Sequence, residues 1–141
     1  MNKREVFKDC TGIAVMKEGK VLLGLRQDGQ GWGLAGGKKE AGETLEACAR
    51  RELKEEFGLE AIDLEYVGIV EAEATIKGVE KLVAPSIYVC NRYIGELNID
   101  KDEHEEYIWV DLREALKIEK IFPPSREGIK LVLEYFGIII N

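Results

Sequence analysis

Hydrophobic residues alternate with polar ones, or run without a break, in five segments that predict β-strands. The first two, residues 11–16 and 21–26, are rich in β-branched and aliphatic side chains and flank a Lys-Glu-Gly-Lys turn, which predicts a hairpin. The other three strand-like segments are residues 65–75, 81–93 and 107–110. These strands supply the sheet of an α/β fold.

Two further segments have helical periodicity. Residues 44–57 are dominated by Leu, Ala, Arg, Glu and Lys, which favour helix, and Thr44 is the expected N-cap. Residues 125–136 carry apolar side chains at helical spacing, after a proline pair at residues 123–124 that we expect to interrupt the chain. Between them, residues 112–116 predict a helical turn or two. The helices are therefore expected to cover a mixed β-sheet.

In the first predicted helix, the stripe that should face the core changes from apolar to acidic. Positions seven apart lie almost on one line along a helix, and Glu52, Glu55 and Glu56 each follow an apolar residue at that spacing. The three apolar residues are Leu45, Cys48 and Ala49. Leu53 and Phe57 are expected to keep the second half of the helix on the core. The carboxylates should then lie close together and partly sheltered from water.

The three glutamates of this stripe would repel one another, and isolated burial would protonate them. A hard divalent cation is the natural partner, because Mg²⁺ takes oxygen ligands, keeps several waters and bridges carboxylates to substrate phosphates. Glu52, Glu55 and Glu56 are therefore candidate ligands of Mg²⁺ or Mn²⁺, and Arg51 could orient one carboxylate through a bidentate contact. The alternative is a solvated helix face with salt bridges, but such a face would place the acids opposite the apolar positions.

A glycine-rich loop precedes the acidic helix, with five glycines between residues 29 and 37. Glycine lets the backbone approach a ligand closely and adopt positive φ angles, although many such clusters are only turns. The position of this loop makes Gly36 and Gly37 candidates for ligand contacts. Arg26, at the end of the second predicted strand, could grip a phosphate, with Lys38 or Lys39 as alternatives. An ordinary surface Arg is the competing interpretation.

The segment from residue 37 to residue 59 has a spacing that average composition does not explain. Gly37 is followed after five residues by Glu43 and after seven more by Arg-Glu-Leu-Lys-Glu-Glu-Phe-Gly-Leu. At average residue usage this arrangement would arise by chance in a chain of this size on the order of once in tens of millions. The segment resembles the Nudix box, the signature of metal-dependent hydrolases that cleave nucleoside diphosphates linked to another group. The flanking segments that also resemble the family are residues 21–26, 31–34 and 103–110.

The resemblance implies the Nudix fold, a mixed β-sheet sandwiched between helices. It also implies that the carbonyl of Gly36 joins the metal ligands and that Glu43 braces the loop against the helix. One departure is Ala35, where family members often have Pro. The missing Pro leaves the unfolded loop freer, which costs about 0.4–1 kcal/mol if the native angles suit Pro, and does not touch the chemistry.

The resemblance also singles out Glu103, in the acidic segment Glu-His-Glu-Glu-Tyr. In some relatives a Glu just before His reaches the metals from a loop across from the helix. Glu105 and Glu106 compete for this role, and an exposed acidic loop is an equal alternative. His104, the only histidine, has no evident nucleophile or carboxylate partner and is expected to be structural.

Composition agrees with a small enzyme. The 141 residues, 45% of them hydrophobic, suffice for one domain with a core, and we expect residues 1–141 to form a single Nudix domain. The net charge of −7 argues against a nucleic-acid polymer or an anionic membrane as a partner. Three widely spaced cysteines suggest neither a disulfide framework nor a thiolate zinc site, and the first nine residues lack an apolar leader. We therefore expect a cytoplasmic protein.

The predicted function is divalent-metal-dependent hydrolysis of a nucleoside diphosphate-linked substrate, with catalysis by Glu52, Glu55 and Glu56 supported by Arg51 and Glu103. The small size favours a nucleoside triphosphate, cleaved to monophosphate and pyrophosphate. Dinucleoside polyphosphates and ADP-ribose are alternatives, and a non-catalytic regulatory Nudix module that binds a nucleotide is a second one. A small nucleotide is the expected partner, and the resemblance adds a homodimer, since relatives are often dimers.

Overall fold

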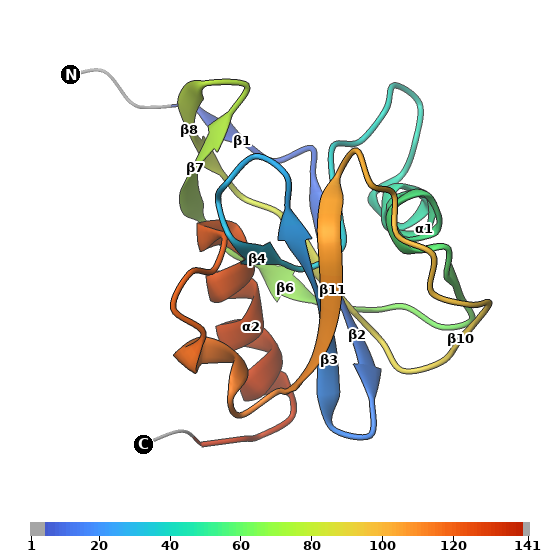
Figure 1. The fold of residues 1–141 in the computed structure, drawn as a ribbon. Helices are drawn as coiled ribbons and strands as arrows, with labels where there is room; N and C mark the ends of the chain where they lie inside the picture. Colours follow the sequence, from blue (N-terminus) through green and yellow to red (C-terminus); the bar gives the residue numbers. More distant parts are fainter. Residues whose placement is uncertain (1–4, 140–141) are drawn as a thin grey trace.

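The computed structural model describes residues 5–139, and its centre is a mixed β-sheet (Figure 1). The strands of this main sheet are β2 (Thr11–Lys17), β3 (Lys20–Arg26), β4 (Trp32–Gly33), β6 (Glu65–Ile69), β9 (Ser86–Cys90) and β11 (His104–Asp111). They lie in the order β11, β3, β2, β9, β6, and β4 pairs with β3. Strand β2 runs antiparallel to β3 and parallel to β9, so the sheet is mixed, as predicted.

Two helices, α1 (Leu45–Phe57) and α2 (Pro123–Tyr135), cover opposite faces of this sheet, and each closes its own hydrophobic core (Figure 1). Successive residues of a strand point to opposite faces, so β2 sends Ile13 toward α1 and Ala14 toward α2. Leu53 of α1 is fully buried in the first core. The prediction of a mixed sheet sandwiched between helices is confirmed.

The remaining elements are small. A second sheet contains β1 (Val6–Phe7), β8 (Val79–Val83) and β7 (Ala72–Ile76), in that order. Strands β5 (Glu60–Ala61) and β10 (Tyr93–Ile94) form a separate pair, and a 3₁₀ turn covers Ala115–Lys117. Residues 1–4, part of the amino-terminal segment considered above, lie outside the described residues, as do residues 140–141.

The predicted strands 65–75 and 81–93 are wrong as single elements, because the chain changes sheets within each of them. The first divides into β6 and β7, and the second overlaps β8, β9 and β10. Gly68, at φ +143°, lies where the register of β6 against β9 shifts, and Pro85 separates β8 from β9. Proline has no N–H to continue a strand ladder, so the break at Pro85 has a local cause.

The helix predictions hold with shifted boundaries. The Thr44 hydroxyl accepts a hydrogen bond from the amide of Ala47 at 3.1 Å, which confirms the expected N-cap of α1. Helix α2 begins at Pro123, because proline at the first helical positions loses no hydrogen bond, so the expected interruption by the proline pair is wrong. Among residues 5–139, no helix is long and apolar enough to cross a membrane.

Helix α2 also supports the glycine loop. The amide of Leu34 donates a hydrogen bond to the hydroxyl of Ser125 at 2.9 Å, and both residues are buried. This bond joins the start of α2 to the backbone just before Gly36. The glycine loop is therefore held from the α2 side of the sheet as well as from α1.

Replacing Ser125 with Ala should destabilise the protein by about 1–3 kcal/mol, because the amide of Leu34 would stay buried without an acceptor. Urea denaturation of the wild type and the variant measures the difference. The control is Glu134→Ala, on the exposed side of the same helix, which should change the free energy of unfolding by less than about 0.5 kcal/mol. Similar losses in the two variants would contradict the assignment.

Candidate functional site

The acidic side chains of α1 differ in exposure although they lie in adjacent turns. Glu56 is 6% exposed, the Glu52 side chain 16% and the Glu55 side chain 56%. Glu52 and Glu56 continue the buried stripe that begins with Cys48 and Ala49, as the sequence predicts. Glu55 lies at the edge of that stripe, in solvent. Of Glu52, Glu55 and Glu56, one carboxylate is thus exposed, one half-buried and one buried.

Glu56 is the most buried of the three glutamates. Its Oε1 accepts a hydrogen bond from the amide of Gly36 at 2.9 Å. Burial raises the pKa of Glu56 well above its ordinary value; the Gly36 bond opposes this shift, whereas the charges of Glu52 and Glu103 add to it. The negative charge of Glu56 is therefore poorly compensated within the protein.

Gly36 and Gly37 bring the loop backbone against both the sheet and the helix. Gly36 has φ +145°, and a Cβ there would lie 2.1 Å from the carbonyl oxygen of Thr11. A Cβ on Gly37 would lie 2.6–2.9 Å from the carboxyl atoms of Glu52. The amide of Thr11 donates to the Gly37 carbonyl at 2.9 Å. Position 36 therefore requires glycine for the sheet contact, whereas a side chain at position 37 would have to displace the Glu52 carboxylate.

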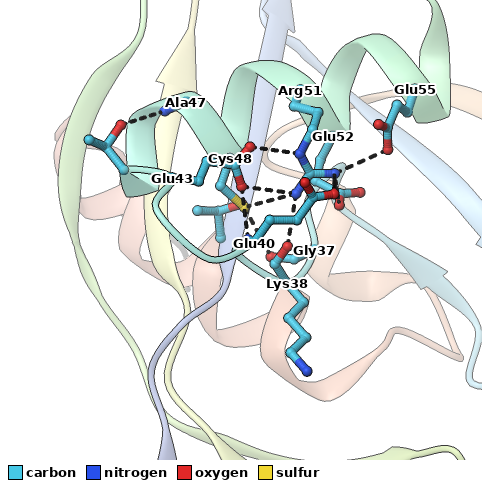
Figure 2. Close-up of polar contacts among 11 residues, drawn as sticks. Gly37, Lys38, Glu40, Glu43, Ala47, Cys48, Arg51, Glu52 and Glu55 are labelled. Carbon is cyan, nitrogen blue, oxygen red and sulfur yellow. Dashed lines mark hydrogen bonds and ion pairs between the residues drawn. The ribbon is translucent and has the colours of Figure 1, made fainter.

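Arg51 links the acidic residues to the loop (Figure 2). Its Nε and Nη2 donate to the two oxygens of Glu43, at 2.7 and 3.0 Å. Its Nη1 donates to Glu52 at 2.8 Å and to Glu55 at 3.1 Å. Nη2 also donates to the carbonyl of Lys38 at 2.9 Å. Arg51 thus makes its one bidentate contact with Glu43, the residue that the family resemblance places as a brace, and bonds singly to Glu52 and Glu55.

The pKa values of Glu43 and Glu52, the two partly buried carboxylates that Arg51 bonds, are shifted in opposite directions. The Arg51 hydrogen bonds lower the pKa of Glu43 to about 2, while Glu43 and then Glu52 raise the pKa of Arg51. Burial raises the pKa of Glu52, Arg51 opposes the shift, and Glu55 and Glu103 add to it. Arg51 therefore favours the ionised form of Glu43 more than that of Glu52.

Glu103 lies in the exposed turn before β11. Among the three candidate acids of that segment, it is the one whose charge acts on both Glu52 and Glu56. Glu105 and Glu106 lie further along the strand and are exposed. The structure therefore brings Glu103 toward the acidic residues of α1.

Arg26 also lies near the acidic residues, since its charge lowers the pKa of Glu56. Its guanidinium pairs with Asp28 at 2.6 Å and lies 3.8 Å from the ring centroid of Phe122. Burial would raise the pKa of Asp28, but the bonds from Arg26 and Gln30 lower it to about 2. The opposite charge two residues after Arg26 could have revealed this pair in the sequence, whereas the contact with Phe122 has no local signal.

Lys38 is arranged differently from its prediction as a phosphate ligand. Its Nζ lies 5.8 Å from the ring centroid of Phe7, and Figure 2 shows the side chain pointing away from Arg51. The carbonyl of Lys38, not its ammonium group, takes part in the network. The structure therefore does not bring the Lys38 charge to the carboxylates.

The donor atoms suit a hard divalent cation, which prefers carboxylate and carbonyl oxygens. Among residues 5–139, Gly36 is the one hydrogen-bond donor to Glu56, so most of the acceptor capacity of this carboxylate is open. Over the same range, no three His, Cys, Asp or Glu side chains converge into a group that could hold an ion. Glu52 and Glu55 instead bond to Arg51. An ion therefore fits the chemistry of the site, with side-chain rotation needed to gather its ligands.

The NUDIX domain family matches residues 7–132, which include the acidic helix, the glycine loop and Glu103. The chain belongs to the Nudix family. The resemblance predicted from the spacing of the box is confirmed.

Three relatives illustrate this membership. The chain is 39% identical over 92 residues to "Oxidized purine nucleoside triphosphate hydrolase" of Danio rerio, covering 63% of this chain and 58% of that relative, so it matches little more than half of the relative's length. It is 31% identical over 126 residues to "8-oxo-dGTP diphosphatase" of Haemophilus influenzae, covering 86% and 87%. It is 32% identical over 113 residues to "CTP pyrophosphohydrolase" of Escherichia coli, covering 77% and 79%.

Solved structures agree on the Nudix fold. The MutT Nudix hydrolase from Burkholderia pseudomallei has a TM-score of 0.79 at 23% identity, covering 92% of this chain and 99% of that chain. The MutT protein from Methanosarcina mazei Go1 has a TM-score of 0.78 at 25% identity, covering 96% and 99%. The predicted Nudix fold is therefore confirmed.

Replacing Glu43 with Gln tests the Arg51 network through the pH dependence of stability. The pKa of Glu43 falls from an ordinary 4.5 to about 2, so its ionised form stabilises the folded protein above pH 4.5. That contribution is lost as the pH falls toward 2, and the variant lacks it at every pH. We expect the variant to be less stable than the wild type at pH 7, with a gap that shrinks between pH 4.5 and 2. Urea denaturation at pH 7, 4 and 2.5 measures the gap, and a constant gap would contradict the network.

Proposed function

We propose that this Nudix protein is a pyrophosphohydrolase that cleaves a nucleoside triphosphate to a monophosphate and pyrophosphate with a divalent cation. The observation that carries the proposal is the Glu56 carboxylate, buried beside the charges of Glu52 and Glu103 with one backbone hydrogen bond. A carboxylate in this setting is typical of a site that a cation completes.

The proposed ligands of Mg²⁺, or of Mn²⁺ in its place, are Glu52, Glu55, Glu56 and the carbonyl of Gly36. The bound ion would neutralise phosphate charge and lower the pKa of an attacking water. Arg51 holds Glu52 and Glu55 in reach of the site, and Glu103 supplies a further carboxylate from the turn before β11. Either Glu55 or Glu56 takes the proton of the water as it attacks phosphorus.

The proposed contacts to the substrate phosphates are Arg26, Lys38, Gly36 and Gly37. Arg26 is the better placed of the two cations, because its charge already acts on Glu56. Asp28 holds the Arg26 guanidinium at the end of β3 by accepting hydrogen bonds from its Nε and Nη2. Lys38 must move away from Phe7 to reach a ligand.

The substrate class rests on the names of the three relatives, each of which denotes action on a nucleoside triphosphate. Dinucleoside polyphosphates and ADP-ribose stay as alternatives. A non-catalytic regulatory Nudix module is less favoured, because such modules usually lose box carboxylates and this chain has all of them. The relatives' names differ in the base, so the proposal is restricted to the triphosphate.

The proposal also covers the setting of the enzyme. We propose one Nudix domain, a small nucleotide as the partner rather than a nucleic-acid polymer or membrane, and a homodimer as an assembly to test by light scattering. Three free thiols favour a reducing compartment such as the cytoplasm.

The test is an activity screen of the purified protein with Mg²⁺ and then Mn²⁺. The substrates are normal and oxidised nucleoside triphosphates, a dinucleoside polyphosphate, ADP-ribose and a nucleotide sugar, with all products separated by chromatography. Monophosphate plus pyrophosphate from a triphosphate supports the proposal. Cleavage of linked dinucleotides or sugars alone would replace the substrate class, and metal binding without turnover would favour the regulatory module.

Replacing Glu56 with Gln keeps the size of the side chain and removes its charge. We expect turnover to fall by at least roughly a hundredfold. The metal-free variant should be no less stable than the wild type, since repulsion from Glu52 and Glu103 is relieved. Steady-state kinetics and thermal unfolding with and without Mg²⁺ check both effects. Glu60→Gln, the same change at an exposed position of β5, should leave turnover unchanged. Near-normal turnover of a folded Glu56→Gln variant would refute the assignment.

Replacing Gly37 with Ala should displace the Glu52 carboxylate, which lies where the new methyl group must go. The displaced atoms are the end of a flexible side chain, so we expect turnover to fall by about tenfold or more while the fold is kept. Gly42→Ala is the matched control: it strains a φ of +79° in the same loop and meets no atom within 4 Å. Steady-state kinetics measures the turnover of both variants, and circular dichroism checks their fold. Equal turnover in the two variants would contradict the predicted contact between residue 37 and Glu52.

A further inference from the structure

The segment that leads into β11 is fixed to the end of α1. The amide of Asn98 donates to the carbonyl of Phe57 at 2.9 Å, and the amide of Asp100 donates to the carbonyl of Glu56 at the same distance. Carbonyls in the last turn of a helix have no partner within the helix, so they are free to accept these bonds. Figure 1 shows this segment passing beside α1 before it enters β11. The backbone of Glu56 is thus one of its two anchors.

The same segment ends in a tight turn that carries Glu103. The amides of Glu103 and His104 both donate to the carbonyl of Asp100, at 3.0 and 2.9 Å. The carbonyl of Glu103 accepts from the amide of Gln27 at 3.0 Å. The turn is therefore bonded to α1 through Asp100 and to the end of β3 through Gln27.

The side chain of His104 fills the space between these two supports. It is 3% exposed, and its ring centroid lies 5.0 Å from that of Phe57. On the other side, a Cβ on Gly24 would lie 2.5–2.9 Å from three atoms of the ring. The imidazole is therefore wedged between the last turn of α1 and strand β3.

On the side of the His104 ring that carries Nδ1, packing rather than hydrogen bonding holds the ring in place. Among residues 5–139, the buried Nδ1 of His104 has no hydrogen-bond partner. A buried polar atom without a partner costs about 1–3 kcal/mol. An apolar side chain of similar volume would avoid that cost and occupy the same space.

We propose that His104 is a positioning residue of the active site, whose ring sets the turn that presents Glu103 to Glu52 and Glu56. Phe57, on which the ring packs, directly follows Glu56, so a shift of the ring moves Glu103 relative to Glu56. The inference rests on the proposed function, in which Glu103 contributes a carboxylate. It assigns a role to a residue that touches neither substrate nor ion.

The first experiment compares variants that change the wedge without changing any acid. His104→Ala leaves a void, and Gly24→Ala pushes the ring from β3. Both should weaken Mn²⁺ binding, measured by calorimetry, and lower kcat by about 10- to 100-fold with little change in KM. His104→Leu keeps the volume and should restore both properties to near wild type. Tyr107→Ala, an exposed residue that pairs with Gly24 across the two strands, is the control and should leave Mn²⁺ affinity unchanged.

A thermodynamic cycle separates positioning from general damage. Glu103→Gln is made in the wild type and in the His104→Ala background, and Mn²⁺ affinity and kcat are measured for all four proteins. If His104 acts through Glu103, the loss caused by Glu103→Gln is smaller in the His104→Ala background. Additive losses, or a His104→Leu variant as impaired as His104→Ala, would overturn the inference. Failure of the proposed function would look different from failure of this inference. The wild type would then hydrolyse no substrate, and Glu56→Gln would have no turnover to lower.

Discussion

The arrangement of the site depends on one constraint, which is that a carboxylate occupies a buried position on α1. Glu56 lies between Leu53 and Phe57, where an apolar residue would be expected, and an ionised carboxyl there is unfavourable without compensation. The compensation that the chain supplies is the amide of Gly36, which can reach the helix only because no Cβ separates the loop from Thr11. The buried acid and the glycine loop therefore have to occur together.

Arg51 determines which of the other carboxylates near Glu56 are paired with a positive charge. Its planar fork donates to Glu43, Glu52, Glu55 and the carbonyl of Lys38, a pattern that the ammonium group of lysine could not reproduce. Within residues 5–139, none of the hydrogen bonds of Arg51 reaches Glu56. Arg51 thus favours the ionised forms of Glu43 and, in part, of Glu52, whereas burial disfavours the ionised form of Glu56. A site built only for stability would have no reason to leave the most buried acid the least compensated.

The sequence predicts α1 well, because its cap, composition and apolar-to-acidic stripe are all local. It fails where long-range contacts decide. The prediction for residues 65–75 misses the change of sheet because the amide of Val70 bonds to the carbonyl of Pro85, fifteen residues along the chain, whereas the break at Pro85 itself has a local signal. The seven-residue spacing also treats Glu55 like Cys48, yet Cys48 is buried because Thr11 and Gly37 contact its sulfur, and Glu55 lies beyond that cover. Local periodicity predicts which residues share a face of a helix, but not which other parts of the chain cover that face.

The two bonds from Arg51 to Glu43 explain how one guanidinium can serve carboxylates that must also move. In the proposed function, Glu52 and Glu55 turn from Arg51 toward an ion, and each rotation removes a hydrogen bond from Nη1. The bonds to Glu43 use Nε and Nη2, so they persist through that rotation and keep the guanidinium in place. Arg51 would otherwise follow the carboxylates or turn to solvent. In the proposed function, Glu43 therefore acts on the site through the position of Arg51, without being a ligand of the ion itself.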